Sequence, residues 1–139
     1  MAYMNQQKKA QIATALKPVL KKYGVKGSLS VRNHSTIQLT VKSGEIDFIS
    51  NYEDCMKERE KRGMIEYRRD KRPTHLDVNV YWFKEHFGGR AVEFLQEAMT
   101  ALRGADWFDK SDIQSDYFHT AYYIDIHIGK WDKPYQLTA

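Results

Sequence analysis

A chain of 139 residues with 42% hydrophobic and 13% aromatic residues is long enough to bury one core, and this composition excludes an intrinsically disordered protein. We therefore expect a single globular domain over residues 1–139. The formal net charge of +4 is unevenly distributed: residues 1–26 carry six lysines and no acid, whereas residues 104–139 carry six aspartates and three lysines.

Membrane proteins and disulfide-linked proteins are excluded by local features of the chain. No apolar run approaches the roughly 20 residues that cross a bilayer, and polar residues 5–9 near the N-terminus do not resemble a secretory signal. Cys55 is the single cysteine, so it has no partner for an internal disulfide, a zinc site or a redox pair. We expect a cytoplasmic protein with a buried Cys55, no cofactor and no membrane partner.

The first predicted elements are a helix and a β-hairpin. An amphipathic pattern predicts a helix over residues 5–23, in which Pro18 should cause a kink or a break and which Gly24 should end. Apolar and polar residues then alternate over 28–32 and 36–42, which predicts two strands joined by a turn at residues 33–35.

A second helix is predicted over residues 45–61, where apolar residues recur at helical spacing. Ser50 followed by Glu53 resembles a capping box, which would start this helix later. The charged stretch that follows, up to Pro73, is predicted to be an exposed helix end or a loop.

The second half of the chain predicts a strand over 75–82, a helix between Gly89 and Gly104, a loop over 105–116 and a final strand over 120–128. In the strand over 75–82, Trp82 is expected to point inward. The resulting order is α-β-β-α-β-α-β. Because each strand has one apolar and one polar face, we expect an α+β fold: a mostly antiparallel four-stranded sheet with three helices on one face.

Both ends of the chain carry runs of residues that are similar to proteins of mobile elements. The residues from Ala15 to Arg32 resemble the start of the large polyvalent protein-associated domain 29 family, and those from Asp116 to Tyr135 resemble the ends of small bacteriophage proteins. The resemblance implies an origin in a bacteriophage or a conjugative element. It implies no activity and no catalytic residues, and it leaves the middle of the chain unmatched.

Two His/Asp pairs form the sharpest candidate for a metal or acid–base site. His75 and Asp77 share the polar face of one predicted strand, and Asp125 and His127 share that of another. If these strands are neighbours, the four side chains converge. The same alternation is also typical of an exposed sheet face without a site, so the pattern leaves both interpretations open.

A basic segment over residues 57–72 is the candidate nucleic-acid-binding element. Eight bases and four acids lie in it, and several cations on one element can neutralise several phosphates. The alternative is a solvated helix end that pairs with its own glutamates. The candidate contact residues are Lys57, Arg59, Arg62, Arg68, Arg69, Lys71 and Arg72.

The C-terminal part is richer in aromatic residues than the predicted inward positions require. Tyr and Trp beside charged residues are typical of protein interfaces, although they also attach loops to a core. The candidate interface residues are Tyr81, Tyr123, Trp131 and Tyr135.

These features favour a non-enzymatic accessory protein of a phage or mobile element that binds a host macromolecule, for host takeover or anti-defence, with a host protein preferred to nucleic acid. The second interpretation is a nucleic-acid-binding protein that uses residues 57–72 and the polar sheet face. The third is a small metal-dependent hydrolase built on the two His/Asp pairs. The sequence carries no information on the oligomeric state.

Overall fold

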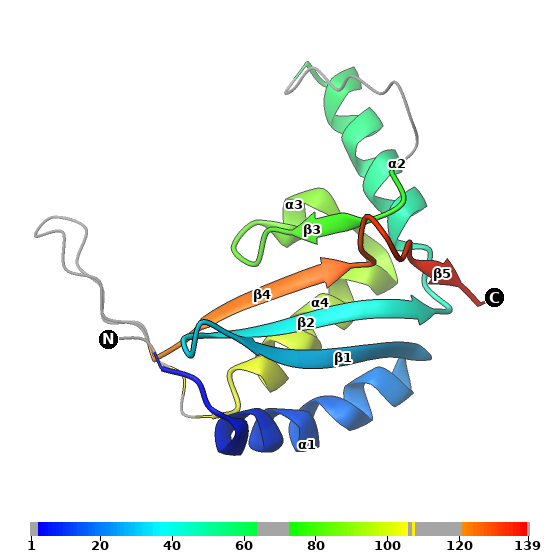
Figure 1. Ribbon diagram of the computed structural model, residues 1–139. Helices are drawn as coiled ribbons and strands as arrows, with labels where there is room; N and C mark the ends of the chain where they lie inside the picture. Colours follow the sequence, from blue (N-terminus) through cyan, green and yellow to red (C-terminus); the bar gives the residue numbers. More distant parts are fainter. Residues whose placement is uncertain (1–2, 64–72, 106, 108–120, 139) are drawn as a thin grey trace, which may run out of the picture.

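The computed structural model describes residues 3–63, 73–105, 107 and 121–138, and within these ranges it confirms the α+β fold (Figure 1). In chain order the elements are α1 (Gln6–Lys22), β1 (Val25–Arg32), β2 (Thr36–Gly44), α2 (Phe48–Lys61), β3 (Leu76–Val78), α3 (Phe83–His86), α4 (Gly89–Leu102), β4 (Tyr123–Ile128) and β5 (Gln136–Leu137). No helix in these ranges has the length and apolarity that a bilayer crossing requires.

The sheet has the strand order β1-β2-β4-β3, and the short β5 pairs with β2 beyond the end of β4. The outer pairs β1–β2 and β3–β4 are antiparallel, as expected for a mostly antiparallel sheet. The central pair β2–β4 is parallel, with Leu39 beside Ile126. Parallel strands need a long crossover, and the chain between β2 and β4 supplies it through α2, α3 and α4.

The predicted β1–β2 hairpin is confirmed, and its turn explains why these residues form it. Asn33 and His34 have φ values of 53° and 54°, and the Ser35 N–H donates to the Arg32 carbonyl at 3.1 Å. Two consecutive positive φ values are typical of the two-residue turn whose twist matches that of the flanking strands. With Ser35 as one further connecting residue, the turn sets Arg32 opposite Thr36 and Ser30 opposite Gln38.

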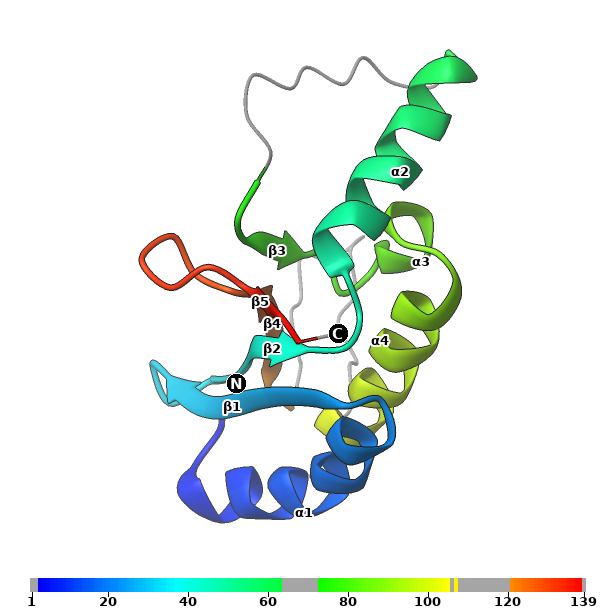
Figure 2. The ribbon, with the colours of Figure 1, turned by 90° about the vertical axis from the view of Figure 1, so that its right-hand side faces the viewer.

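The core lies between one face of the sheet and the helices, as Figure 2 shows. Alternate residues of β2 and β4 point into it, and the apolar stripe of α4 covers them. The buried apolar residues of these three elements are Ile37, Leu39, Val41, Ile124, Ile126, Ile128, Ala91, Phe94, Leu95, Ala98, Met99, Ala101 and Leu102. The α4 residues among them recur at helical spacing, as expected for the helix predicted between Gly89 and Gly104.

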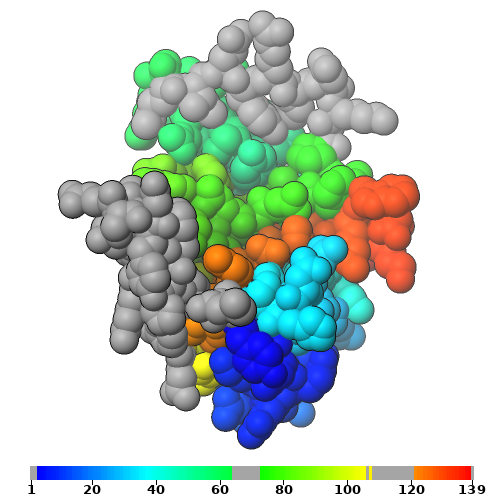
Figure 3. Space-filling model, turned by 60° about the vertical axis from the view of Figure 1, so that its left-hand side comes forward, coloured from blue at the N-terminus to red at the C-terminus, as the bar shows by residue number. Residues whose placement is uncertain are grey.

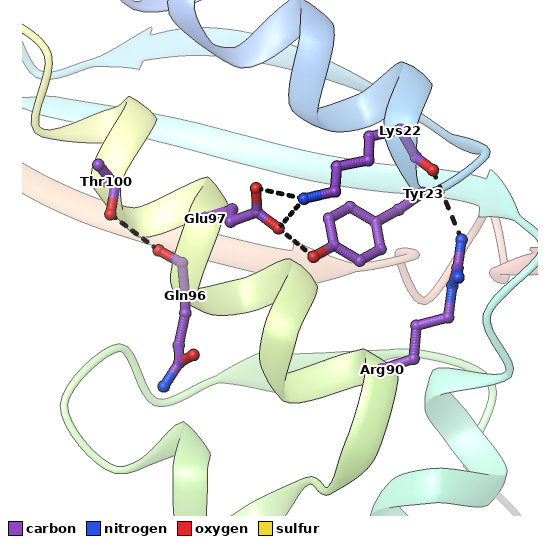
Figure 4. A network of polar contacts seen from close by, with 6 residues as sticks. All are labelled: Lys22, Tyr23, Arg90, Gln96, Glu97 and Thr100. Carbon is purple, nitrogen blue, oxygen red and sulfur yellow. Dashed lines mark hydrogen bonds and ion pairs between the residues drawn. The ribbon is translucent and has the colours of Figure 1, made fainter.

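Polar contacts attach the end of α1 to α4 at the edge of this core (Figure 4). The Lys22 ammonium lies 3.0 Å from a carboxylate oxygen of Glu97, and the Tyr23 hydroxyl donates to the other oxygen. Arg90 donates to the Lys22 carbonyl at 3.5 Å and lies over the Tyr23 ring. Pro18 does not divide α1, which is continuous from Gln6 to Lys22.

The third strand is shorter than predicted. β3 ends at Val78 because the Asn79 side chain accepts hydrogen bonds from the backbone N–H groups of Tyr81 and Trp82, at 2.9 and 3.1 Å. An Asx turn of this kind competes with the strand ladder. The expected inward position of Trp82 is therefore wrong: 56% of this residue is exposed.

The second helix starts between the two predicted positions. Asp47 caps α2, since its carboxylate accepts from the Ser50 N–H at 3.0 Å and from the Ser50 hydroxyl at 2.9 Å. Ser50 is therefore inside the helix and does not cap it. Cys55 is partly buried rather than fully buried, and its Sγ lies 3.4 Å from the Glu85 carbonyl oxygen. Desolvation raises the pKa of this thiol.

The predicted loop over 105–116 and the first residue of the predicted strand over 120–128 lie largely outside the described residues. β4 begins at Tyr123, after the buried Tyr122, whose hydroxyl donates to the Leu102 carbonyl at 2.6 Å. This hydrogen bond connects the start of β4 to the end of α4.

Candidate functional site

Polar side chains cover the face of the sheet that carries no helix. One row of outward-facing residues crosses the four main strands, and each residue in it pairs in register with the next. This row consists of Ser28, Thr40, His127 and Asp77. Ser30, Gln38 and Asp125 form the next row. The strands themselves therefore place hydroxyl, amide, imidazole and carboxylate groups side by side.

An open groove of about 590 Å³ lies on this face. In Figure 3 the atoms of β4 lie between the β1–β2 hairpin and the segment around β3, and residues 129–135 stand at one end. The groove is lined by Ser30, Arg32, Gln38, His75, Asp77, His127, Gly129, Lys130 and Trp131. Among the lining residues, Asp77 is the one carboxylate, beside two permanent cations and two imidazoles.

The structure brings together three of the four predicted His/Asp residues. His127 Nδ1 lies 2.5 Å from Asp77 Oδ1, and His75 lines the same groove. Asp125 is one pleat away along β4, beside Gln38, and does not line the groove. Within the described ranges, no three His, Cys, Asp or Glu side chains gather as a set that could hold a metal ion.

A buried amide orients the groove's arginine. Gln38 is only 6% exposed although it lies on the outward face, and its Oε1 accepts from Arg32 Nη1 at 3.0 Å. Its Nε2 lies 3.5 Å from Thr40 Oγ1, and Thr40 is 5% exposed. The guanidinium has five donors, so the bond to Gln38 restrains it and leaves further donors for a ligand. The sequence prediction missed Arg32 and Gln38 because their contact depends on the β1–β2 register.

A tight loop after β4 presents Trp131. Gly129, with φ +71°, donates its N–H to the Val41 carbonyl at 2.8 Å, and Lys130 and Lys133 exchange backbone hydrogen bonds of 2.9 and 3.2 Å. A Cβ on Gly129 would lie 2.5 Å from the Tyr135 nitrogen, so this approach requires glycine. The loop projects away from the helices in Figure 2. It leaves Trp131 82% exposed at the groove's end.

The other three candidate interface aromatics have different surroundings. Tyr81 and Tyr123 are 74% and 48% exposed, and both line a small pocket at the start of β4, the end opposite Trp131. Tyr135 is partly buried: its hydroxyl donates to the Ile46 carbonyl at 2.6 Å, and its ring packs edge-on against Phe48. Burial raises the pKa of Tyr135 well above the ordinary value for tyrosine.

Two of the three candidate cations that the structure describes in the basic segment make contacts within the protein. Arg59 Nη1 donates to the Glu85 carbonyl at 3.2 Å, and Arg62 pairs with Glu58 one helical turn away at 3.2 Å. Lys57 is exposed on α2. The remaining candidates, Arg68, Arg69, Lys71 and Arg72, lie outside the described residues. The polar groove is therefore the most complete candidate site in the ranges that the structure describes.

Comparisons of the chain with protein-family models, with curated proteins and with solved structures find no match.

Proposed function

We propose that the polar face of the sheet binds single-stranded nucleic acid. The observation that carries this proposal is the combination, in one open groove, of Arg32, Lys130 and the exposed Trp131. Proteins that bind single strands combine cations along the backbone path with aromatic side chains on which bases stack. An open sheet face also admits unpaired bases that a duplex would hide.

The charge of the surroundings supports the proposal. Lys26 and Lys42 are exposed at the ends of β1 and β2 near the bulge, on the outward side, and extend the row of cations beyond the groove. The chain as a whole has a sequence pI of about 9.1, so its long-range field attracts polyanions. The exposed Ser30 adds an uncharged hydrogen-bonding group for sugar and base edges.

Binding of fluorescent single-stranded oligonucleotides, measured by anisotropy over a range of salt concentrations, tests the proposal. Trp131→Ala should lose one stacking contact, worth about 1–3 kcal/mol, which corresponds to a roughly 5- to 150-fold weaker Kd. Arg32→Ala and Lys130→Ala should each lower the slope of log K against log salt by about 0.7, as expected for one phosphate contact on a single strand.

Two matched variants control for surface changes in general. Trp82→Ala removes an exposed tryptophan outside the groove, and Lys17→Ala removes an exposed charge on α1, so neither should alter affinity or salt slope. Absence of binding by the wild type at low salt would contradict the proposal. An equal loss in Trp82→Ala and Trp131→Ala would mean that the groove is not the binding surface.

A host protein is the second candidate partner, in keeping with the mobile-element origin that the sequence resemblance implies. The observation that favours it is the exposure of Tyr81 and Tyr123 beside the pocket at the start of β4. Exposed tyrosines are enriched at protein interfaces. Capture of one defined protein from nuclease-treated host lysate, lost in Tyr81→Ala with Tyr123→Ala but retained in Trp131→Ala, would support this partner.

A further inference from the structure

His75, which directly precedes β3, and His127 of β4 both line the groove. Asp77 faces His127 and Leu76 faces Ile128 in the β3–β4 register, so His75 is diagonal to His127 on the same face. Diagonal neighbours in an antiparallel pair are separated by about 7–8 Å. Both side chains line one groove of about 590 Å³, so a phosphodiester group bound in this groove can contact both imidazoles.

Asp77 sets the orientation of the His127 ring. The ionised carboxylate only accepts hydrogen bonds, so the contact of 2.5 Å places the imidazole proton on Nδ1. Nε2 then remains as the proton acceptor. The same carboxylate also favours the imidazolium that forms when Nε2 takes a proton, less strongly than a buried aspartate would because the Asp77 side chain is 80% exposed. His127 is therefore suited to act as a general base, and Asp77 as its positioning residue.

The groove also offers groups for the phosphate itself. Arg32, held by the buried Gln38, and Lys130 line the same space as the two histidines. Preoriented cations stabilise negative charge that develops on phosphate oxygens in a transition state more strongly than mobile ones do. His75, whose Nδ1 lies 3.4 Å from the Thr74 hydroxyl, lines the same groove two residues before Asp77, and its imidazole can supply the acid of the reaction.

We propose that this groove cleaves single-stranded RNA by an acid–base reaction of the RNA's own 2′-hydroxyl, an inference that rests on the nucleic-acid binding proposed above. His127 Nε2 takes the 2′-hydroxyl proton while O2′ forms a bond to the adjacent phosphorus. The bond from phosphorus to O5′ breaks, and protonated His75 gives its proton to the departing O5′. One product ends in a 2′,3′-cyclic phosphate and the other begins with a 5′-hydroxyl. No water or other co-reactant is consumed.

The experiment uses the full chain with a mixed-sequence single-stranded RNA and the DNA of the same sequence, in buffer containing a chelator. The wild type should cleave the RNA to 2′,3′-cyclic phosphate and 5′-hydroxyl ends, and should bind the DNA without cleaving it because the DNA lacks the attacking hydroxyl. His127→Ala and His75→Ala should each lower the cleavage rate by about 10²–10⁴-fold.

Asp77→Asn separates positioning from a structural role. It should lower kcat while KM and the melting temperature stay near the wild-type values, whereas a purely structural residue would lower the melting temperature and leave kcat of the folded protein unchanged. His34→Asn is the matched control, because His34 lies in the β1–β2 turn with φ 54°, which Asn tolerates, and outside the groove. This variant should cleave RNA at the wild-type rate.

The outcomes distinguish this inference from the proposal on which it rests. RNA and DNA that are bound but not cleaved would overturn the inference and leave the binding function standing. Failure to bind either nucleic acid would overturn both. Equal cleavage by the wild type and the His75→Ala/His127→Ala double variant, purified in parallel, would assign the activity to a contaminant. Products with 5′-phosphate ends would show a different reaction and would also overturn the inference.

Discussion

Glu97 shows how single residues respond to their surroundings in this protein. Hydrogen bonds from Tyr23 and Lys22 lower the pKa of its carboxyl below the ordinary 4.5. The hydrogen bond to Glu97 in turn raises the pKa of Lys22 above 10.5 and that of Tyr23 above 10.0. The cluster joins the end of α1 to α4, so its protonation states are linked to the stability of the fold.

The sign of this linkage gives a pH prediction for Glu97→Gln. A lowered carboxyl pKa stabilises the native state above the unfolded value of 4.5, and this contribution is lost as the pH falls through the folded pKa. Lys22 and Tyr23 have raised pKa values in the folded protein, so they stabilise the native state below about pH 10. This contribution is lost as the pH rises through their folded pKa values. The wild type should therefore exceed Glu97→Gln in melting temperature most between these limits.

Thermal melts of both proteins from acid to alkaline pH check this expectation. Glu93→Gln is the control, because Glu93 is exposed on the same helix one turn earlier. It should follow the wild-type curve much more closely. A melting-temperature difference between wild type and Glu97→Gln that stays constant down to the lowest pH would contradict the assigned linkage.

At the scale of elements, the sequence predicted correctly those helices and strands that depend on residues near one another in the chain. The stripe of α4 and the β1–β2 hairpin follow from periodicity and turn residues, and both are confirmed. The end of β3 was missed because the Asn79 side chain stops the strand although alternation continues to Trp82. The start of α2 was missed because Asp47 competes with Ser50 as the cap, and both residue types are good caps.

Asp47→Ala tests the cap of α2. Loss of the bonds to the Ser50 N–H and hydroxyl should lower the free energy of unfolding by about 0.5–2 kcal/mol. Asp54→Ala removes an exposed aspartate from the same helix and should change it by less than about 0.5 kcal/mol. Urea denaturation measures both. Equal losses in the two variants would show that charge on α2, rather than capping, explains the effect.

At the scale of the whole molecule, the helices cover one face of the sheet and the other face is left for the groove. The polar faces of the two His/Asp strands could be predicted from alternation, but their adjacency could not. β3 and β4 are separated by two helices in the chain, and pairing at that distance leaves no local signal. The same reason hid the parallel β2–β4 pair, which brings Gln38 and Thr40 beside Asp125 and His127.

A substitution of Ile126 tests whether the sheet has one face buried under the helices and one face open to the groove. It is 1% exposed at the centre of the sheet, between Leu39 on β2 and Val78 on β3, and it points toward the helices. Ile126→Ala should cost about 2–5 kcal/mol, a large part of the roughly 5–15 kcal/mol that stabilises a domain. Asp125→Ala, one residue earlier on the outward face, should cost less than about 0.5 kcal/mol.

Urea denaturation of both variants compares the two faces of β4 directly. Below its denaturation midpoint, folded Ile126→Ala should bind oligonucleotides like the wild type, because Ile126 points away from the groove and alternate residues of a strand lie on opposite faces. A larger loss of stability in Asp125→Ala than in Ile126→Ala would mean that the buried and exposed faces of β4 are interchanged. In that case His127 would point into the core, and the groove with its Asp77–His127 pair could not form.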